Sequence, residues 1–469
     1  MNAIKPPALR AMLAAVTLSA GLIPGRAADD SDAEIKTLRE QIRLLDERLH
    51  QLEQKQQLKE QEAAAATKAA PRIIASDTGF AITSADGANS LKLRGLVQLD
   101  SRTFFADGGI VNNAFVLRRA RLFFEGTIGR DFSFQLVPEF GGGSSTGSTV
   151  PSILDANLGV TLSKGLQFKI GKFKSPVGHE LLQPETSTLF SERSLATNLV
   201  PNRDLGIQAS GELLKGTVNY AVGVFNGVAD GASSTNADFD NDKDVAGRVM
   251  ASPFRNRVDS PVQGLHLGVS GSFGREKTAS GHTSAYRTDG QQVFFSYAAS
   301  TISDGQAWRL SPQVDYRYGS LGVLGEYVLS TVNVRPSLTG PKAELQNHAW
   351  QLAVGYVLTG EKSSYAGLVP ATNFDYRQGT WGAFEVAARC ANLKIDDAAF
   401  PLFASAASNA DEATAFGVGL NWYLSKAAIF KFDYYHTSFG FNPAAPRVST
   451  APVLQQDEKV FITRFQLAF

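Results

Sequence analysis

Three arginines stand close together inside a stretch of apolar and β-branched residues, FVLRRARLFFEGTIG at 115–129. They are Arg118, Arg119 and Arg121. A guanidinium group presents paired N–H donors in a fixed plane, so such a cluster is suited to binding oxyanions such as phosphate. Whether it does so depends on the strand that carries it, because the direction of each side chain decides what the cluster meets.

Strand side chains alternate between two faces. Arg119 and Arg121 therefore share one face, and the residues between and after them, such as Ala120 and Leu122, share the other. An arginine that faces lipid at mid-bilayer costs about 2 to 4 kcal/mol, so the sequence predicts that this pair faces a water-filled lumen. Arg118 is out of phase with the pair. It is predicted to lie near a strand end, where that cost falls towards zero.

The same alternation runs from about residue 79 to the C-terminus, beginning with LKLRGLVQLDSRTF at 91–104. It places further basic residues on the lumen face: Lys92, Arg94, Lys169, Arg248, Arg309, Arg317, Arg389, Lys431 and Arg464. Acidic residues share that face: Asp100, Glu125, Glu139, Asp155, Asp315, Glu326, Glu385 and Asp433. Two interpretations remain open. The lumen wall is either evenly salt-bridged, or it holds a local guanidinium excess where Arg94, Arg119 and Arg121 meet on adjacent strands.

The alternating segments number about seventeen, and most have the length of about 9 to 11 residues that a tilted transmembrane strand needs. Single-chain bacterial barrels have even strand numbers. We therefore assign the poorly alternating QQVFFSYAAS (291–300) to a loop and predict an all-β, 16-stranded antiparallel transmembrane β-barrel at 71–469. Tight turns alternate with long polar stretches, as periplasmic turns and extracellular loops do. The long stretches are 140–152, 174–204, 227–243, 274–305 and 395–411.

The N-terminus has the pattern of a secretory signal peptide at 1–27. Lys5 and Arg10 precede an apolar run at 11–23, which is too short to span a bilayer and is followed by small residues. Cleavage is predicted after Ala27.

Residues 28–70 carry a heptad seam followed by an Ala-rich linker. The seam predicts a short coiled-coil helix. Ile at heptad position a with Leu at position d favours a parallel coiled coil of two helices. A lone amphipathic helix is the alternative interpretation. The seam residues are Ile35, Leu38, Ile42, Leu45, Leu49 and Leu52.

Composition and near-miss motifs argue against catalysis. The single cysteine, Cys390, leaves no disulfide framework and no cysteine-rich zinc site. HELLQ at 179–183 lacks the second histidine of a zinc-protease helix, and DFDNDKD at 238–244 lacks the glycine and final glutamate of a calcium loop. We therefore predict no enzyme activity, no cofactor, no metal and no nucleic-acid partner. The formal net charge is zero, so any ion preference depends on where the charges point.

Several motifs lie in one order from roughly residue 80 to 469: FVLRRARLFFEGTI, KIGKFKSPVGHE, VPNRDLGIQASG, GTWGAFEVAARCANLKI and ITRFQLAF. Together they resemble the phosphate-selective porin O and P family of Gram-negative outer membranes. The resemblance implies a homotrimer of sixteen-stranded barrels that takes up phosphate or polyphosphate passively through an arginine-lined constriction. It also implies that the third extracellular loop, here 174–204, folds into the pore.

The candidate pore-lining and anion-binding residues are Arg94, Arg118, Arg119, Arg121, Lys169, Arg193 and Arg203. The expected partners are small anions, outer-membrane lipid and further copies of the chain, with residues 28–70 in the periplasm. Two alternatives remain: a general or organic-solute porin without phosphate selectivity, and an outer-membrane tether that acts through the coiled coil. The resemblance places Arg118 near the constriction, whereas the alternation pattern does not.

Overall fold

The computed structural model describes residues 29–76, 79–105, 112–142, 151–277, 284–442 and 456–469. The predicted signal peptide, 1–27, lies outside the described residues. The described chain separates into two units, 1–70 and 71–469.

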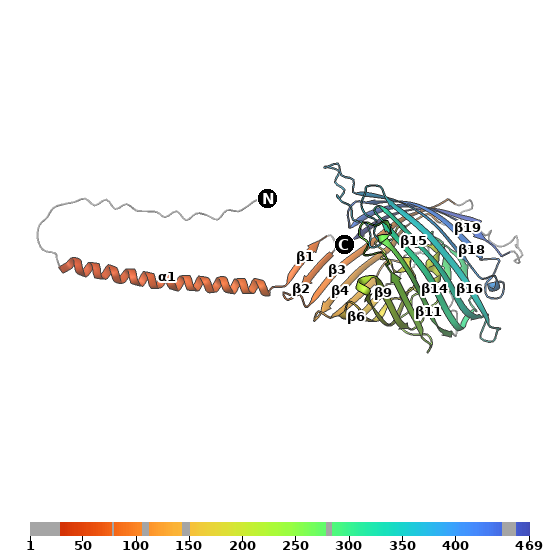
Figure 1. Cartoon of the computed structure of the whole chain (residues 1–469), viewed down its shortest axis with the longest axis horizontal. Helices are drawn as coiled ribbons and strands as arrows, with labels where there is room; N and C mark the ends of the chain where they lie inside the picture. The colour runs from red at the N-terminus through yellow and green to blue at the C-terminus, as the bar shows by residue number, and fades with distance from the viewer. Residues whose placement is uncertain (1–28, 77–78, 106–111, 143–150, 278–283, 443–455) are drawn as a thin grey trace. The chain divides into compact units, whose positions relative to one another are not determined.

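Sixteen antiparallel strands close into a barrel, which confirms the predicted fold (Figure 1). Closure comes from β20 pairing with β3, where Val460 lies opposite Phe104 and Ala468 lies opposite Leu96. A hairpin of β1 (Arg72–Ser76) and β2 (Gly79–Thr83) extends the same sheet along the start of β3. The barrel strands are β3 (Ser90–Phe104), β4 (Ala114–Ile128), β5 (Phe132–Glu139), β6 (Ser152–Ser163), β7 (Leu166–Lys174), β8 (Arg203–Leu213), β9 (Val218–Phe225), β10 (Asp244–Ala251), β11 (Leu265–Lys277), β14 (Ile302–Tyr318), β15 (Leu321–Arg335), β16 (Ala343–Val357), β17 (Ala383–Lys394), β18 (Glu412–Tyr423), β19 (Ala428–Gly440) and β20 (Asp457–Ala468).

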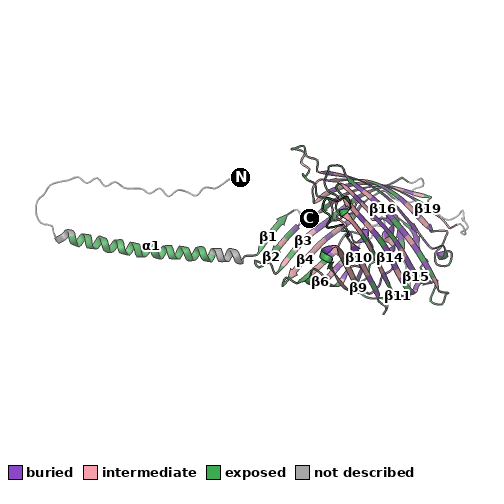
Figure 2. Cartoon of the chain, in the orientation of Figure 1, coloured by how far each residue is buried: buried purple, intermediate pink, exposed green. Residues whose placement is uncertain are grey.

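Burial alternates along the strands, as the period of two requires (Figure 2). On β16, the inward Gln351 is 3% exposed and the outward Leu352 is 48% exposed. The barrel therefore has an apolar outer face and a polar lumen. The lumen side chains come from every strand, so residues far apart in sequence meet there.

The two ends of the barrel differ. At the turn end, where β3 begins and β20 ends, most connections are tight, such as 129–131 and 164–165. Several of the described loop-end connections reach the inside of the barrel, and two of them carry helical turns or strands into the lumen cavity. They are loop L3 (175–202), with α2 (His179–Leu182) and the 3-10 turn η1 (Leu195–Leu199), and loop L5, whose described part (284–301) carries the hairpin β12 (Ala285–Arg287) and β13 (Val293–Ser296).

The structure bears on two expectations about these connections. The stretch 291–300 does lie outside the barrel wall, although part of it forms β13. The expectation of tight turns throughout the turn end is wrong for two connections, 252–264 between β10 and β11 and the turn-end segment 358–382 between β16 and β17. Gln183 in L3 donates to the Tyr365 carbonyl at 2.9 Å, so this segment reaches L3 from the opposite end.

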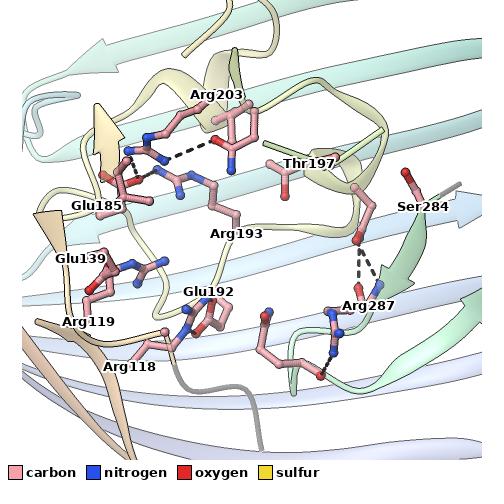
Figure 3. A pocket seen from close by; sticks show the side chains of 18 of the residues that line it. Arg118, Arg119, Glu139, Glu185, Glu192, Arg193, Thr197, Arg203, Ser284 and Arg287 are labelled. Atoms are coloured by element: carbon pink, nitrogen blue, oxygen red, sulfur yellow. Dashed lines mark hydrogen bonds and ion pairs between the residues drawn. The ribbon is translucent and has the colours of Figure 1, made fainter. Parts of the chain in front are cut away.

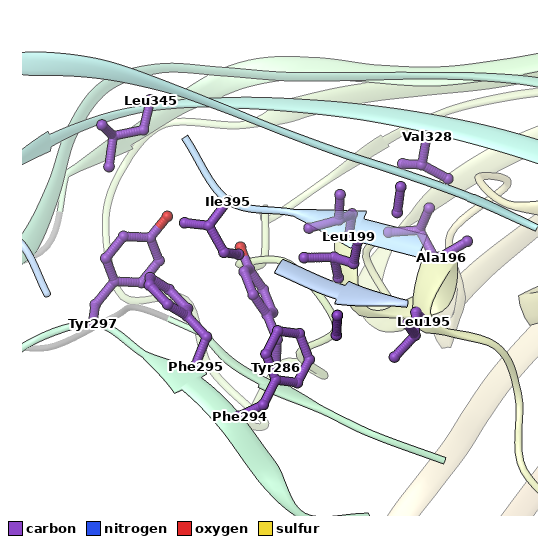
Figure 4. Packing of buried hydrophobic residues seen from close by; sticks show 14 of the residues in the cluster. Leu195, Ala196, Leu199, Tyr286, Phe294, Phe295, Tyr297, Val328, Leu345 and Ile395 are labelled. Carbon is purple, nitrogen blue, oxygen red and sulfur yellow. The ribbon is translucent and has the colours of Figure 1, made fainter. Parts of the chain in front are cut away.

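An apolar core inside the barrel supports the inserted loops (Figure 4). Leu195 and Leu199 of L3 are buried with Phe295 of L5 and with wall residues such as Val328. Because L3 and L5 pack on each other and on the wall, they occupy part of the lumen as a fixed obstruction.

The helix α1 spans Asp29–Ala69. Its six heptad residues are between 47% (Ile35) and 67% (Leu52) exposed. The coiled coil therefore stays a prediction that needs a second helix to cover the seam. In the part of the chain that the structure describes, no helix has the length and apolar character needed to cross a membrane.

Candidate functional site

A β-bulge decides the direction of Arg118. In the pairing of β4 with β3, Arg119 lies opposite Gln98 and Leu117 lies opposite Leu99, so Arg118 is the extra residue. A bulge re-aims a side chain, and here Arg118 points into the lumen beside Arg119. Its Nε and Nη2 donate to Glu192 at 2.7 and 2.9 Å, and the side chain is 18% exposed. The prediction that Arg118 lies off phase near a strand end is wrong, because simple alternation does not allow for the bulge.

The arginines of β4 line a lumen cavity of about 730 Å³ together with L3 and L5 (Figure 3). Five of the seven predicted site residues lie around this cavity: Arg118, Arg119, Arg121, Arg193 and Arg203. Arg287 on β12 is a sixth arginine. The acidic residues of the lining are Glu139, Glu185, Glu192 and Asp230.

Glu185 in L3 balances several of these arginines. Its carboxylate lies 3.3 Å from Arg121, 3.4 Å from Arg193 and 3.6 Å from Arg203, and Lys174 approaches to 3.1 Å. Burial raises the pKa of Glu185, but the surrounding cations outweigh burial and hold that pKa well below its usual range. Glu185 is therefore a carboxylate at neutral pH, and the charges around it are largely paired.

Glu192 fastens L3 to the wall in the same way. Its carboxylate accepts hydrogen bonds from Arg118, from Arg102 on β3 at 2.9 Å and from Arg464 on β20 at 2.9 Å. Burial again raises the pKa, and the arginines again hold it well below its usual range. Sequence reasoning missed both L3 glutamates, since they lie in a loop without periodicity.

Arg119 differs from its neighbours because it has no counter-charge. Its Nη1 donates to the Gln98 side chain at 2.5 Å, and its buried Nε has no hydrogen-bond partner. Among the described residues no carboxylate lies within ion-pair distance of it, although the side chain is only 7% exposed. Because Arg119 lines the cavity, its guanidinium group stands without a counter-charge beside the space that a solute would enter.

Arg287 is the second cavity arginine without an ion pair among the residues that the structure describes. Its Nη1 donates to the Gln291 carbonyl at 3.0 Å, and its backbone N–H donates to Asn198 in L3 at 3.0 Å. No periodic pattern in the sequence points to Arg287, because its position in the lumen depends on the fold of L5.

Arg94 and Lys169 lie elsewhere. Arg94 does not line the cavity that Arg119 and Arg121 line, so the interpretation in which these three arginines form one local cluster is wrong. Arg94 forms a bidentate pair with Glu125 at 2.8 and 2.9 Å.

Arg94 lines a second cavity of about 300 Å³, together with Lys92 and Lys426. Lys169 lines neither of these two cavities, and its Nζ lies 5.2 Å from the centre of the Phe173 ring.

A layer of polar contacts joins L3 to the wall and to the turn-end segment. Gln98 and Gln466 are linked at 2.6 Å, and Gln466 also donates to the Thr186 carbonyl at 3.0 Å. The Ser187 hydroxyl donates to the Ala366 carbonyl at 2.7 Å. Next to it, Gly367 has φ 105°, and a Cβ there would lie 2.9 Å from the Ser187 hydroxyl, so both backbone and space favour glycine.

The remaining lumen arginines are mostly paired. Arg309 on β14 pairs with Asp230 at 2.6 Å, and Arg464 pairs with Asp100 at 2.6 Å. Most of the wall is thus salt-bridged. Among the described residues, the lumen cavity keeps two guanidinium groups without an ion pair, Arg119 and Arg287, and Arg248 on β10 has none outside that cavity.

Comparison with known proteins gives a family and a fold. The sequence model of the family described as phosphate-selective porin O and P matches residues 91–469. No curated protein sequence matches the chain. The solved outer-membrane channel DcaP of Acinetobacter baumannii is 12% identical with a TM-score of 0.52, covering 81% of this chain and 98% of DcaP. Salmonella typhi OmpF in complex with daunomycin is 12% identical with a TM-score of 0.50, covering 85% and 100%. At this identity the two structures show the barrel fold alone.

Proposed function

Because the chain belongs to the phosphate-selective porin O and P family, we propose that it forms an outer-membrane pore through which small anions, phosphate or polyphosphate above all, diffuse passively. The observation that carries the proposal is Arg119, a guanidinium group in the lumen cavity without a carboxylate partner in the described structure. A permeating anion would supply the missing counter-charge.

The charge balance of the cavity supports an anion preference. Six arginines and four acidic residues line it, and Glu185 and Glu192 are ionised at neutral pH. The field inside therefore favours anions, and it is little screened because the walls are of low dielectric constant. Arg118, Arg121, Arg193 and Arg203 would shape this field, whereas Arg119 would contact the anion.

Arg94 and Lys169 have different proposed roles. Arg94, with Lys92 and Lys426, would keep the turn-end cavity attractive to anions that have passed L3. Lys169 would act at longer range from the lumen wall, because it does not line either cavity.

We further propose a homotrimer in the Gram-negative outer membrane, with residues 28–70 in the periplasm after removal of 1–27. The exposed heptad seam of α1 supports association of the helices. The seam alone favours a coiled coil of two helices, whereas the family resemblance favours an assembly of three chains. We propose that contacts between the barrels form the trimer and that association of the α1 helices adds to its stability.

Phosphate block of the chloride current tests the anion site. We expect phosphate at low concentration to reduce single-channel chloride conductance of the full-length protein, because the doubly charged anion competes for the Arg119 donors. An anion-selective current without phosphate block would contradict phosphate binding and leave a general anion porin.

A second candidate function is a general or organic-solute porin. The volume of the cavity, about 730 Å³, lies within the range of sites for drug-sized molecules and so favours this alternative. Permeation rates of neutral and anionic solutes of equal size would separate the two functions, because only an anion channel passes the anion faster.

The third candidate, an outer-membrane tether, depends on α1. Deletion of 28–70 would leave conductance intact and weaken the envelope if tethering is the function. Unchanged envelope integrity would exclude it.

A further inference from the structure

Loop L3 is fastened to the lumen wall formed by β10, β14 and β15, as well as to the arginines of β3, β4 and β20. The backbone N–H groups of His179 and Glu180 donate to the two carboxylate oxygens of Glu326 on β15, at 2.7 and 3.2 Å. This attachment holds the start of L3, and the side chain of His179 lies at its centre.

The His179 imidazole contacts three different elements. Its Nδ1 lies 2.7 Å from Nη2 of Arg248 on β10, and its Nε2 lies 3.7 Å from the carboxylate of Asp315 on β14. Its ring stacks on Tyr365 of the turn-end segment, with centroids 4.6 Å apart and an angle of 15°. The Tyr365 hydroxyl also donates to the His179 carbonyl at 2.7 Å. His179, which is 4% exposed, therefore joins L3, the wall and the turn-end segment.

The arginine fixes the protonation state of this imidazole. A guanidinium N–H can only donate, so Nδ1 must accept and carries no proton. The neutral ring then carries its proton on Nε2, which faces Asp315. A second proton can be added only at Nδ1. There it would place two donors and two positive charges 2.7 Å apart, so Arg248 would have to move away.

We infer that His179 is an acid-sensitive latch on L3. The neutral ring holds L3 against Arg248 and the turn-end segment, and the protonated ring displaces Arg248 and loosens both contacts. Because L3 borders the lumen cavity, loosening it changes the current through the barrel. This inference rests on the proposed channel function, but it does not depend on which ion the channel prefers.

Charged and titratable groups face His179 from every element packed against it. These groups carry both signs of charge: Asp315 and Glu326 are acidic, whereas Arg248 and Arg317 are basic. Asp315 is also held by Arg317 at 2.8 Å, which limits how far it can move towards the ring. The groups are Arg248 on β10, His266 on β11, Asp315 and Arg317 on β14, Glu326 on β15, Tyr365 in the turn-end segment and Glu180 in L3.

Asparagine is the informative replacement. In His179→Asn, the amide oxygen can accept from Arg248 as Nδ1 does, and it does not titrate. The chain offers two matched controls. His266→Asn removes a histidine that lies opposite Asp315 and hydrogen-bonds Ser252 at 2.6 Å, and His348→Asn removes one that stacks on Tyr327 on β15.

The test is single-channel recording of the full-length protein at pH about 7.5 and about 5, which brackets the range in which histidine titrates. We expect wild type to change conductance level about tenfold more often at the lower pH, the factor that corresponds to losing one hydrogen bond to a charged group. His179→Asn should lose this acid response, and both control variants should keep it.

Hydrogen exchange gives a second readout on the same proteins. After correction for intrinsic pH dependence, amides at 178–194 should exchange faster at the lower pH in wild type and not in His179→Asn. Arg248→Gln, which removes the opposing charge, should also lose the acid response, so the inference does not depend on one variant folding. An acid response that persists in His179→Asn, that disappears in His266→Asn, or that is absent from wild type would overturn it. Reversal potentials at pH about 7.5 test anion preference separately.

Discussion

At the level of single residues, the contrast between Arg119 and Arg121 shows what a binding site requires. Both lie on the lumen face of β4, as their spacing predicts. Arg121 pairs with Glu139 and lies 3.3 Å from Glu185, whereas Arg119 donates only to Gln98 in the described structure. The alternation of the sequence places these side chains and Glu139 on the lumen face, but it does not place the counter-charges of Glu185 and Glu192, because those two residues come from L3.

Arg119→Gln should weaken phosphate block of the chloride current by about tenfold or more, since a hydrogen bond to a charged group contributes about 1.5 to 3 kcal/mol. Arg94→Gln is the matched control, because Arg94 is paired with Glu125 and lines the other cavity. Equal phosphate block in wild type and Arg119→Gln would exclude Arg119 as the contact residue.

Glu192→Gln should destabilise the barrel by about 3 to 5 kcal/mol at neutral pH, because it leaves several buried arginines without their shared partner. The measurement is urea unfolding in detergent micelles, with the exposed Glu344→Gln on β16 as control. The pKa of Glu192 is depressed, so its contribution is fully present above the ordinary value of 4.5 and is lost as pH falls through the folded value. The two proteins should therefore converge in strong acid, and a difference that grows there would contradict this account.

At the level of elements, the bulge in β4 explains how three arginines within four positions all face the lumen. Sequence periodicity placed β4 and the phase of its second half correctly. It could not place the bulge, because the extra residue is defined only by pairing with β3.

Deletion of Arg118 should leave an assembled barrel, because removing the extra residue restores regular pairing and keeps the phase of Val116 and Arg119. Deletion of Ala120 should prevent assembly, because the side chains on one side of the deletion would exchange the lumen face for the lipid face. Each arginine moved to the lipid face would cost about 2 to 4 kcal/mol. Heat-modifiable mobility in gel electrophoresis reports assembly. Equal yields of the two deletion variants would argue against the bulge.

The segments inside the barrel were only partly predictable from the sequence. The resemblance indicated that 174–204 folds inwards, and the poor alternation of 291–300 kept that stretch out of the wall. The turn-end segment 358–382 and Arg287 were missed, because their positions depend on long-range contacts such as that of Gln183 with the Tyr365 carbonyl.

The helix α1 yields a prediction of its own. Ile42→Asp on the seam should make α1 more sensitive to protease, because a buried coiled-coil position would become charged. Leu44→Asp is the control, since Leu44 is an equally exposed leucine outside the seam. Conductance should be unchanged in both. Equal protease sensitivity of the two variants would favour a lone helix.

At the level of the whole molecule, the chain has no net charge, so its proposed ion preference must come from position alone. Most of the barrel wall is salt-bridged, Glu185 and Glu192 of L3 pair with its arginines, and six arginines and four acidic residues line one cavity. Fold and family were predictable from strand periodicity and ordered motifs. The distribution of paired and unpaired arginines was not, because it depends on loops that carry no periodic signal.

Reversal potential in a KCl gradient tests the central claim most directly, because it reports the preference of the whole lumen for one sign of charge. We expect a potential of the sign set by chloride, which should move towards zero in Arg119→Gln. A potential of the sign set by potassium in the wild-type protein would contradict the account.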